Sequence, residues 1–170
     1  MKILNVALTL CWILLAIRIS SAAPYSSIVN PDGATQLSAV VGGQQVVVNI
    51  WTHKVDIGKM GVERPPLPHN ICTYSRVPCS VVEAAQIIVD RNAIFIPRSA
   101  FSDLSDLGTI KLEVIGGHTT LILHGGDASE GYEAKIEFDG ERVARRVVAS
   151  GMDVDHPTEI TTYYETPPLD

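Results

Sequence analysis

The sequence predicts an all-β fold, mainly antiparallel, that is either a sandwich or an open barrel built from a meander of short hairpins. Short runs rich in β-branched residues recur along the chain, and turn residues such as glycine and aspartate separate them at regular intervals. No long amphipathic helical pattern occurs, and at most one short helix is expected, near residues 99–104. Because apolar and polar residues alternate within several runs, we expect strands with one buried and one solvated face.

The first 22 residues have the pattern of a cleavable secretion signal. The apolar run from residue 3 to residue 17 is too short to span a bilayer comfortably. Ser20 and Ala22 are the small residues that a signal peptidase requires for cleavage after Ala22, and cleavage after Ala23 is the alternative. We therefore expect a periplasmic or extracellular mature protein that has no stable membrane anchor after cleavage.

Composition limits the domain count and the classes of partner. Cleavage removes Lys2 and Arg18 but none of the 19 acidic residues, so the mature charge is more negative than the −6 of the full sequence. An acidic surface argues against nucleic acid and anionic lipid as partners, and it suits a basic protein partner or solubility alone. The remaining length is enough for one domain, which we place at residues 37–170.

The segment that follows the signal is predicted to be irregular at first and then to form a hairpin. Residues 23–36 are mostly polar and contain Asn30-Pro31-Asp32-Gly33, which is typical of a turn, so we expect a flexible arm there. Two β-branched runs follow, at residues 37–41 and 44–51. The intervening Gly42-Gly43 favours a tight hairpin turn.

Residues 58–80 are predicted to be an irregular, proline-rich surface loop closed near its end by a disulfide. Its four prolines fix φ and remove backbone donors. Cys72 and Cys79 are the only cysteines left after signal cleavage, and two nearby cysteines usually join in an oxidising compartment. Closing so small a ring contributes about 2.5 kcal/mol in the chain-entropy treatment. A metal would need two more nearby ligands, and redox pairs usually have two intervening residues, so a structural disulfide is the favoured interpretation.

Two hairpins and a short helix are predicted next. Residues 87–96 are nearly continuous in apolar residues on both sides of Asp90-Arg91-Asn92, which indicates a central hairpin buried on both faces. Residues 99–104 suit one or two helical turns with Ser99 as the cap. Thr109 to His124 predicts a hairpin that turns at Gly116-Gly117. Its expected core residues are Ile110, Leu112, Val114, Leu121 and Leu123.

The run from Tyr132 to Val148 predicts a hairpin whose turn is Asp139-Gly140. The corresponding register pairs Phe138 with Glu141, Glu137 with Arg142, and Glu133 with Arg146. The same register places Arg145 on the apolar face, opposite Ala134. There we expect its stem to cover apolar surface and its guanidinium to pair with Glu141 or Asp127, in preference to binding a ligand. Residues 159–164, rich in threonine and tyrosine, predict the last strand.

The sequence contains no catalytic, phosphate-binding or cofactor motif. His118 and His124 lie about 20 Å apart along one strand face, which is too far for them to share an ion. The run Asp153-Val154-Asp155-His156 has too few ligands for a calcium site, so a turn is favoured. We expect no metal and no cofactor. A hydrolase assembled from scattered residues such as His53, His69, Asp153 and His156 stays an alternative.

The ring closed by Cys72 and Cys79 resembles the inhibitory loop of Bowman–Birk protease inhibitors. Its sequence begins with Cys72-Thr73-Tyr74-Ser75 and ends with Pro78-Cys79; it is one residue shorter than the family's ring, and Val77 stands where the family has a proline. The resemblance implies that Tyr74 enters a protease specificity pocket and that Ser75 follows the scissile bond, with chymotrypsin-like selectivity. We take Tyr74, Ser75 and Arg76 as the candidate binding residues.

About the last hundred residues resemble a group of uncharacterised exported bacterial proteins, in the segments 72–79, 94–99, 101–104, 126–127 and 145–146. No activity is attached to that group, so the resemblance implies export and an independent β-domain and transfers no functional residue. We expect an exported, non-enzymatic domain that binds an unidentified protein through residues 58–80, with inhibition of a protein as one form of that binding. A small periplasmic hydrolase and a passive structural component of the envelope are the alternatives.

Overall fold

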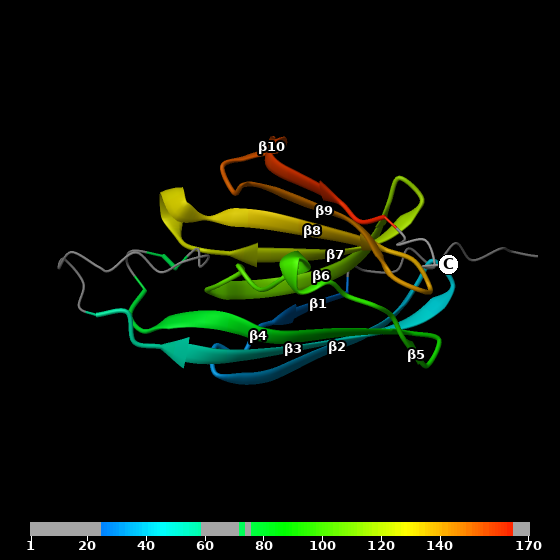
Figure 1. The fold of residues 1–170 in the computed structure, drawn as a ribbon, viewed down its shortest axis with the longest axis horizontal. Coiled ribbons are helices and arrows are strands. Elements are labelled where there is room, and N and C mark those ends of the chain that lie inside the picture. Colours follow the sequence, from blue (N-terminus) through cyan, green and yellow to red (C-terminus); the bar gives the residue numbers. More distant parts are fainter. Residues whose placement is uncertain (1–24, 59–71, 74–75, 165–170) are drawn as a thin grey trace, which may run out of the picture.

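The fold is a two-layer antiparallel β-sandwich, which confirms the predicted class. The computed structural model describes residues 25–58, 72–73 and 76–164. A six-stranded sheet of order β1-β6-β7-β8-β9-β10 packs on a four-stranded sheet of order β2-β3-β4-β5, and most strands run along the long axis of the molecule (Figure 1). The strands are β1 Tyr25–Ile28, β2 Gly33–Val41, β3 Gln44–Val55, β4 Cys79–Val89, β5 Asn92–Ala93, β6 Leu107–Ile115, β7 His118–Gly125, β8 Tyr132–Phe138, β9 Val143–Ser150 and β10 Asp153–Thr162.

The first predicted hairpin is confirmed as β2 and β3. Val41 pairs with Gln44 across the turn, and the two turn residues, Gly42 and Gly43, have φ of 59° and 84°. Left-handed backbone at both central positions is what a two-residue hairpin turn requires, and glycine adopts it without a steric cost. Alternate residues of β2 are buried, so one of its faces contributes to the core.

The described part of the predicted arm, residues 25–36, is ordered structure, so the expectation of a flexible arm is wrong. Tyr25–Ile28 pairs with β6, and β2 begins as early as Gly33. Two hydrogen bonds fix the turn between these strands, from the Asn30 amide to Thr35 Oγ1 (2.8 Å) and from Thr52 Oγ1 to the Asn30 carbonyl (2.5 Å). β1 is an exposed edge strand, so its sequence shows little of the alternation of apolar and polar residues that predicts a strand. A polar segment of this kind therefore predicts an arm.

The apolar run at residues 87–96 is only partly the central hairpin that was predicted. β4 lies inside the four-stranded sheet, and Ile87 is buried, but β5 has two exposed residues and forms the edge of the sheet. The turn is Asp90-Arg91, with φ of 47° and 74°. After β5 the chain leaves the four-stranded sheet and crosses to the six-stranded sheet. Phe95 lies in this crossing segment and is 69% exposed. The continuous apolar sequence therefore predicted β4 correctly, but the second strand that it predicted is longer than the observed β5.

The hairpin of β6 and β7 has the predicted turn at Gly116-Gly117, because Ile115 pairs with His118. Four of the five expected core residues are at most 2% exposed: Ile110, Leu112, Leu121 and Leu123. Val114 is an exception, since it is half exposed. Val114 lies beside Gly42, which is in the turn between β2 and β3. The four-stranded sheet ends at this turn, so little of that sheet covers the Val114 side chain.

The predicted register of the hairpin of β8 and β9 is wrong. Phe138 pairs with Val143, so the connection has four residues, and a bulge follows between Glu137 and Phe138. The side chain of Asp139 selects this longer turn, because its Oδ1 accepts the amides of Glu141 (2.8 Å) and Arg142 (2.9 Å). The bulge moves Arg145 opposite Glu137 and moves Arg146 opposite Ile136. The arginine on the apolar side is therefore Arg146, and Arg145 is on the solvated side.

Residues 94–106 connect the two sheets along one side of the sandwich. Phe95 exchanges backbone hydrogen bonds with the turn after β8, and the Val82 amide of β4 donates to Leu104 (3.1 Å). The expected helix is a single 3₁₀ turn, Arg98–Ala100, preceded by Pro97 and not capped by Ser99. Proline already fixes the φ of the capping position.

The last predicted strand is confirmed as part of β10, which pairs with β9 and begins at Asp153, earlier than predicted. Residues 153–156 thus belong to a strand instead of the expected turn. One apolar cluster fills the space between the two sheets, with contributions from β2, β3 and β4 on one side and from β6 to β9 on the other.

Candidate binding site at the base of the disulfide ring

The predicted disulfide joins Cys72 and Cys79, with an S–S distance of 2.01 Å and a Cα–Cα distance of 5.7 Å. Cys79 is the first residue of β4 and is fully buried. It packs with Ile57 and Val81 in a small apolar cluster at the end of the sandwich where β3 stops and β4 begins. We call residues 72–79 the disulfide ring. One end of the ring is therefore continuous with a core strand, and the other end is held by the sulfur bridge.

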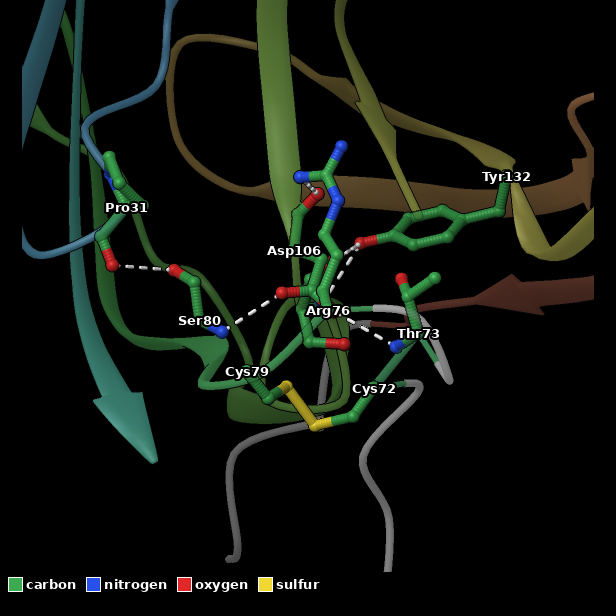
Figure 2. The surroundings of a disulfide bond; sticks show 9 residues. Pro31, Cys72, Thr73, Arg76, Cys79, Ser80, Asp106 and Tyr132 are labelled. Carbon is green, nitrogen blue, oxygen red and sulfur yellow. Dashed lines mark hydrogen bonds between the residues drawn. A yellow bond between two sulfur atoms is a disulfide. The ribbon is translucent and has the colours of Figure 1, made fainter. Parts of the chain in front are cut away.

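Asp106 holds both ends of the disulfide ring through its side chain (Figure 2). Its Oδ2 accepts the Thr73 amide and its Oδ1 accepts the Ser80 amide, each at 2.9 Å. Asp106 is 2% exposed, so both hydrogen bonds are sheltered from water. A buried amide without an acceptor costs about 1–3 kcal/mol, so this one carboxyl group satisfies two donors that would otherwise destabilise the fold.

The backbone of Asp106 adds further contacts at the same place. Its amide donates to the Ser80 carbonyl (2.6 Å), and its carbonyl accepts the Gly126 amide (3.2 Å). Its φ is 49°, a left-handed conformation that aspartate and asparagine tolerate better than most residues. Asp106 therefore ties together the disulfide ring, the start of β4 and the end of β7.

Two neighbouring side chains support this arrangement (Figure 2). Tyr132 donates its hydroxyl hydrogen to the Ser105 carbonyl (2.7 Å) and accepts the Ser105 amide (3.1 Å), which fixes the residue before Asp106. Burial raises the pKa of the Tyr132 phenol, so it is a neutral donor at ordinary pH. Ser80 Oγ donates to the Pro31 carbonyl (2.8 Å), which links the ring to the turn between β1 and β2.

Of the candidate binding residues, Arg76 lies within the described residues, and Tyr74 and Ser75 lie outside them. Arg76 is exposed, its amide donates to the Thr73 carbonyl (3.2 Å), and one guanidinium nitrogen contacts the Asp106 carbonyl at 3.5 Å. The backbone of Arg76 is therefore held by Thr73, and Arg76 remains exposed.

The titratable residues considered for catalysis are distributed over separate places. His53 is 3.6 Å from Glu83 on the four-stranded sheet, whereas His156 is 2.8 Å from Asp153 on β10 of the other sheet; all four side chains are exposed. His69 lies outside the described residues. Within the ranges that the structure describes, no group of three or more potential ligands could hold a metal ion. Of the residues proposed for a scattered hydrolase site, Asp153 and His156 are thus in contact with each other, and His53 lies on the other sheet.

His124 is exposed, as expected, and it contacts Glu133 at 2.9 Å. Burial alone would raise the pKa of the Glu133 carboxyl, but hydrogen bonds from Lys135 and His124, together with their charges, outweigh burial and lower it. Lys135 lies 2.8 Å from Glu133. This cluster is an ion-paired patch on the outer face of the six-stranded sheet.

The two adjacent arginines of β9 have different environments. Arg145 is partly exposed and pairs with Glu137 at 3.2 Å, which replaces the expected pairing with Glu141 or Asp127. Arg146 is 3% exposed and is held by Asp103 and Glu159, each at 2.6 Å. Its guanidinium joins the connection between the sheets to β10 and closes the core at that side of the sandwich. Because Arg146 is buried and pairs with two carboxyl groups of the same chain, its role is structural.

Sequence reasoning found the disulfide but missed Asp106, Tyr132 and Arg146. Asp106 is 33 residues from Thr73 and 26 residues from Ser80, so no local pattern connects it to the ring. A signal was nevertheless present, because the polar pair Ser105-Asp106 lies between two leucines, Leu104 and Leu107. A carboxyl group that is buried in such a place must find donors, and backbone amides at the base of a loop are suitable ones.

The fold and this site define an antiparallel β-sandwich that carries a disulfide ring where β3 ends and β4 begins. No protein-family model, curated protein or solved structure matches the chain. Among the residues that the structure describes, no helix is long and apolar enough to cross a membrane.

Proposed function

We propose that this is an exported, non-enzymatic binding domain that contacts a protein partner through residues 58–80. The observation that carries the proposal is the clamp by Asp106, whose side chain holds the amides of Thr73 and Ser80 at the two ends of the disulfide ring. A loop whose ends are fixed loses less conformational entropy when it binds, so a rigid base favours a recognition role. Binding residues are commonly placed on loops supported by a rigid scaffold.

Two further observations support the proposal. The disulfide fits an oxidising compartment, in agreement with the predicted secretion signal. The acidic net charge of −6 favours a basic partner. In this proposal the protein uses no cofactor and no covalent chemistry, and Tyr74, Ser75 and Arg76 make the contacts.

Affinity recovery of partners from the envelope fraction, followed by mass spectrometry, tests this function. The mature protein and its Tyr74→Ala and Arg76→Ala variants would be used as baits. Arg145→Ala is the matched control, because it removes a partly exposed arginine that lies in β9 of the six-stranded sheet and outside the ring. We expect one protein to be recovered by the parent and by Arg145→Ala, and to be reduced at least about tenfold by the two ring variants, which corresponds to about 1.4 kcal/mol.

Recovery that is the same for all four baits would contradict a role of the ring. Recovery of no protein by any bait would favour a passive structural component. Inhibition of a chymotrypsin-like protease by the parent protein, lost in Tyr74→Ala, would identify the partner class implied by the Bowman–Birk resemblance.

A further inference from the structure

The four edges of the sandwich are protected to different degrees. The edge strands are β1 and β10 in one sheet and β2 and β5 in the other. An edge strand has unpaired backbone donors and acceptors, and natural proteins usually protect it by shortness, charge, proline or a bulge. An edge without such protection is a site at which another strand can add to the sheet.

Three of the edges have such protection. β1 has four residues and β5 has two. β10 is longer, but it contains Pro157, two register irregularities and three acidic residues, which are Asp153, Asp155 and Glu159. The part of β4 beyond β5 is contacted by Leu104 and Ser105 from the connection between the sheets. None of these edges presents a long, regular and uncharged strand.

β2 has none of these protections. It has nine residues, Gly-Ala-Thr-Gln-Leu-Ser-Ala-Val-Val, with no charged residue and no proline. Its pairing with β3 continues without a register shift from Gly33 to Val41. Within the described ranges, no strand pairs with its other side. β2 is thus a long, regular and neutral edge in a chain whose net charge is −6.

The turn after β2 determines which backbone groups face the open side. Val41 and Gln44 flank a two-residue turn and therefore form a hydrogen-bonded pair. Because bonded and non-bonded positions alternate along an antiparallel pair, the odd-numbered residues of β2 point their backbone groups toward β3. The even-numbered residues point theirs outward: Ala34, Gln36, Ser38 and Val40.

We propose that this open edge pairs with β2 of a second copy of the chain, so that two four-stranded sheets join into one continuous antiparallel sheet. A register centred on Leu37 uses the whole strand and places Gln36 of one copy opposite Ser38 of the other, and Ala34 opposite Val40. All four outward-facing positions are hydrogen-bonded positions in this register, so every open donor and acceptor gains a partner.

A second copy is favoured over an unrelated strand because β2 is complementary to itself. An isologous interface uses the same strand from both copies, so that residue i faces residue j and residue j faces residue i, and a strand without charge produces no like-charge pair in such an interface. An acidic chain repels its own copies elsewhere on the surface, which makes a neutral edge the suitable place for self-association. Dimerisation would also shelter Val40, which is 53% exposed.

The test measures oligomeric state by sedimentation over a wide range of concentration, with three variants of the mature protein. Ser38→Pro removes an outward-facing amide without removing a backbone hydrogen bond to β3, and proline is tolerated at such edge positions. Gln36→Lys combined with Ser38→Lys places lysines opposite each other and keeps every amide, although it removes the side-chain hydrogen bonds from Gln36 to Asn49 and from Gln45 to Ser38. Gln45→Lys is the control, because it removes the same Gln45–Ser38 side-chain hydrogen bond that both edge variants remove and adds one charge to an exposed position of β3, while the backbone edge of β2 is unchanged.

We expect a dimer for the parent and for Gln45→Lys, and a dissociation constant raised about tenfold or more in the other two. Amide hydrogen exchange should show protection at Ala34, Gln36, Ser38 and Val40 in the dimers of the parent and of Gln45→Lys, and should not show it in a monomer. A parent that is monomeric at every concentration would overturn the proposal. A dimer that both edge variants leave unaffected would also overturn it. Protection of the edge amides in a monomer would overturn it as well, because another segment of the same chain would then occupy the edge.

Discussion

Replacement of Asp106 by asparagine tests the clamp at the base of the disulfide ring. The variant keeps the size of the side chain, and asparagine also tolerates the left-handed backbone found at this position, where φ is 49°. It replaces one acceptor oxygen by an NH₂ group, which cannot accept the amide of Thr73 or Ser80. One of the two hydrogen bonds, each 2.9 Å long in the parent, is therefore lost.

The size of the effect follows from burial. Because Asp106 is 2% exposed, water cannot replace the lost acceptor, and the remaining amide faces another donor. We expect the free energy of unfolding to fall by about 2 kcal/mol, the middle of the range for a buried unsatisfied group. For a domain of this size the melting temperature then falls by about 4–8 °C. Urea denaturation with the disulfide intact measures the loss directly.

Asp139→Asn is the matched control for this variant. The Asp139 side chain also accepts two backbone amides, at 2.8 and 2.9 Å, but in an exposed turn. Both amides donate to the same oxygen, Oδ1, so the asparagine side-chain carbonyl keeps both hydrogen bonds and the expected cost is below about 1 kcal/mol. If Asp106→Asn costs no more than Asp139→Asn, the second acceptor oxygen of Asp106 does not stabilise the fold, and the reasoning fails.

Two other predictions concern ion pairs. Arg146→Met leaves the carboxyl groups of Asp103 and Glu159 without their shared cation. We expect the free energy of unfolding, measured in urea, to fall by about 3 kcal/mol, against less than about 1 kcal/mol for Arg145→Met. Equal losses would contradict the structural role of Arg146. The lowered pKa of Glu133 means that its ionised form stabilises the fold above its ordinary pKa, and that this contribution is lost as pH falls through the lower folded value. Melting temperatures of the parent should therefore approach those of Glu133→Gln between about pH 5 and pH 3, and parallel curves would refute this assignment.

The sequence predicted the fold class and two hairpin turns because those features depend on local physics. Glycine pairs at 42–43 and 116–117 supply the left-handed backbone of two-residue turns, and alternation identified most of the core. The turn at Asp139 shows where local rules stop. Both a two-residue and a four-residue connection suit Asp-Gly, and the aspartate side chain selects the longer one by accepting two amides. The bulge that follows places Arg145 on the solvated face and Arg146 on the apolar face, which is the reverse of the prediction.

The candidate site was predicted only where its residues are close in sequence. The cysteines are 7 residues apart and could be paired from composition alone. The clamp by Asp106 depends on how the connection between the sheets passes the start of β4, which is a property of the whole fold. An edge strand such as β1 was missed for a related reason, because its pairing with β6 involves few buried side chains.

The clamp has a consequence for how much the ring sequence is free to vary. Asp106 recognises Thr73 and Ser80 through their main-chain amides, so its two hydrogen bonds do not depend on the side chains of the ring residues between them. The scaffold therefore places little demand on the identity of the side chains it displays. New specificities can be grafted between the two anchor points while the sandwich beneath them stays unchanged.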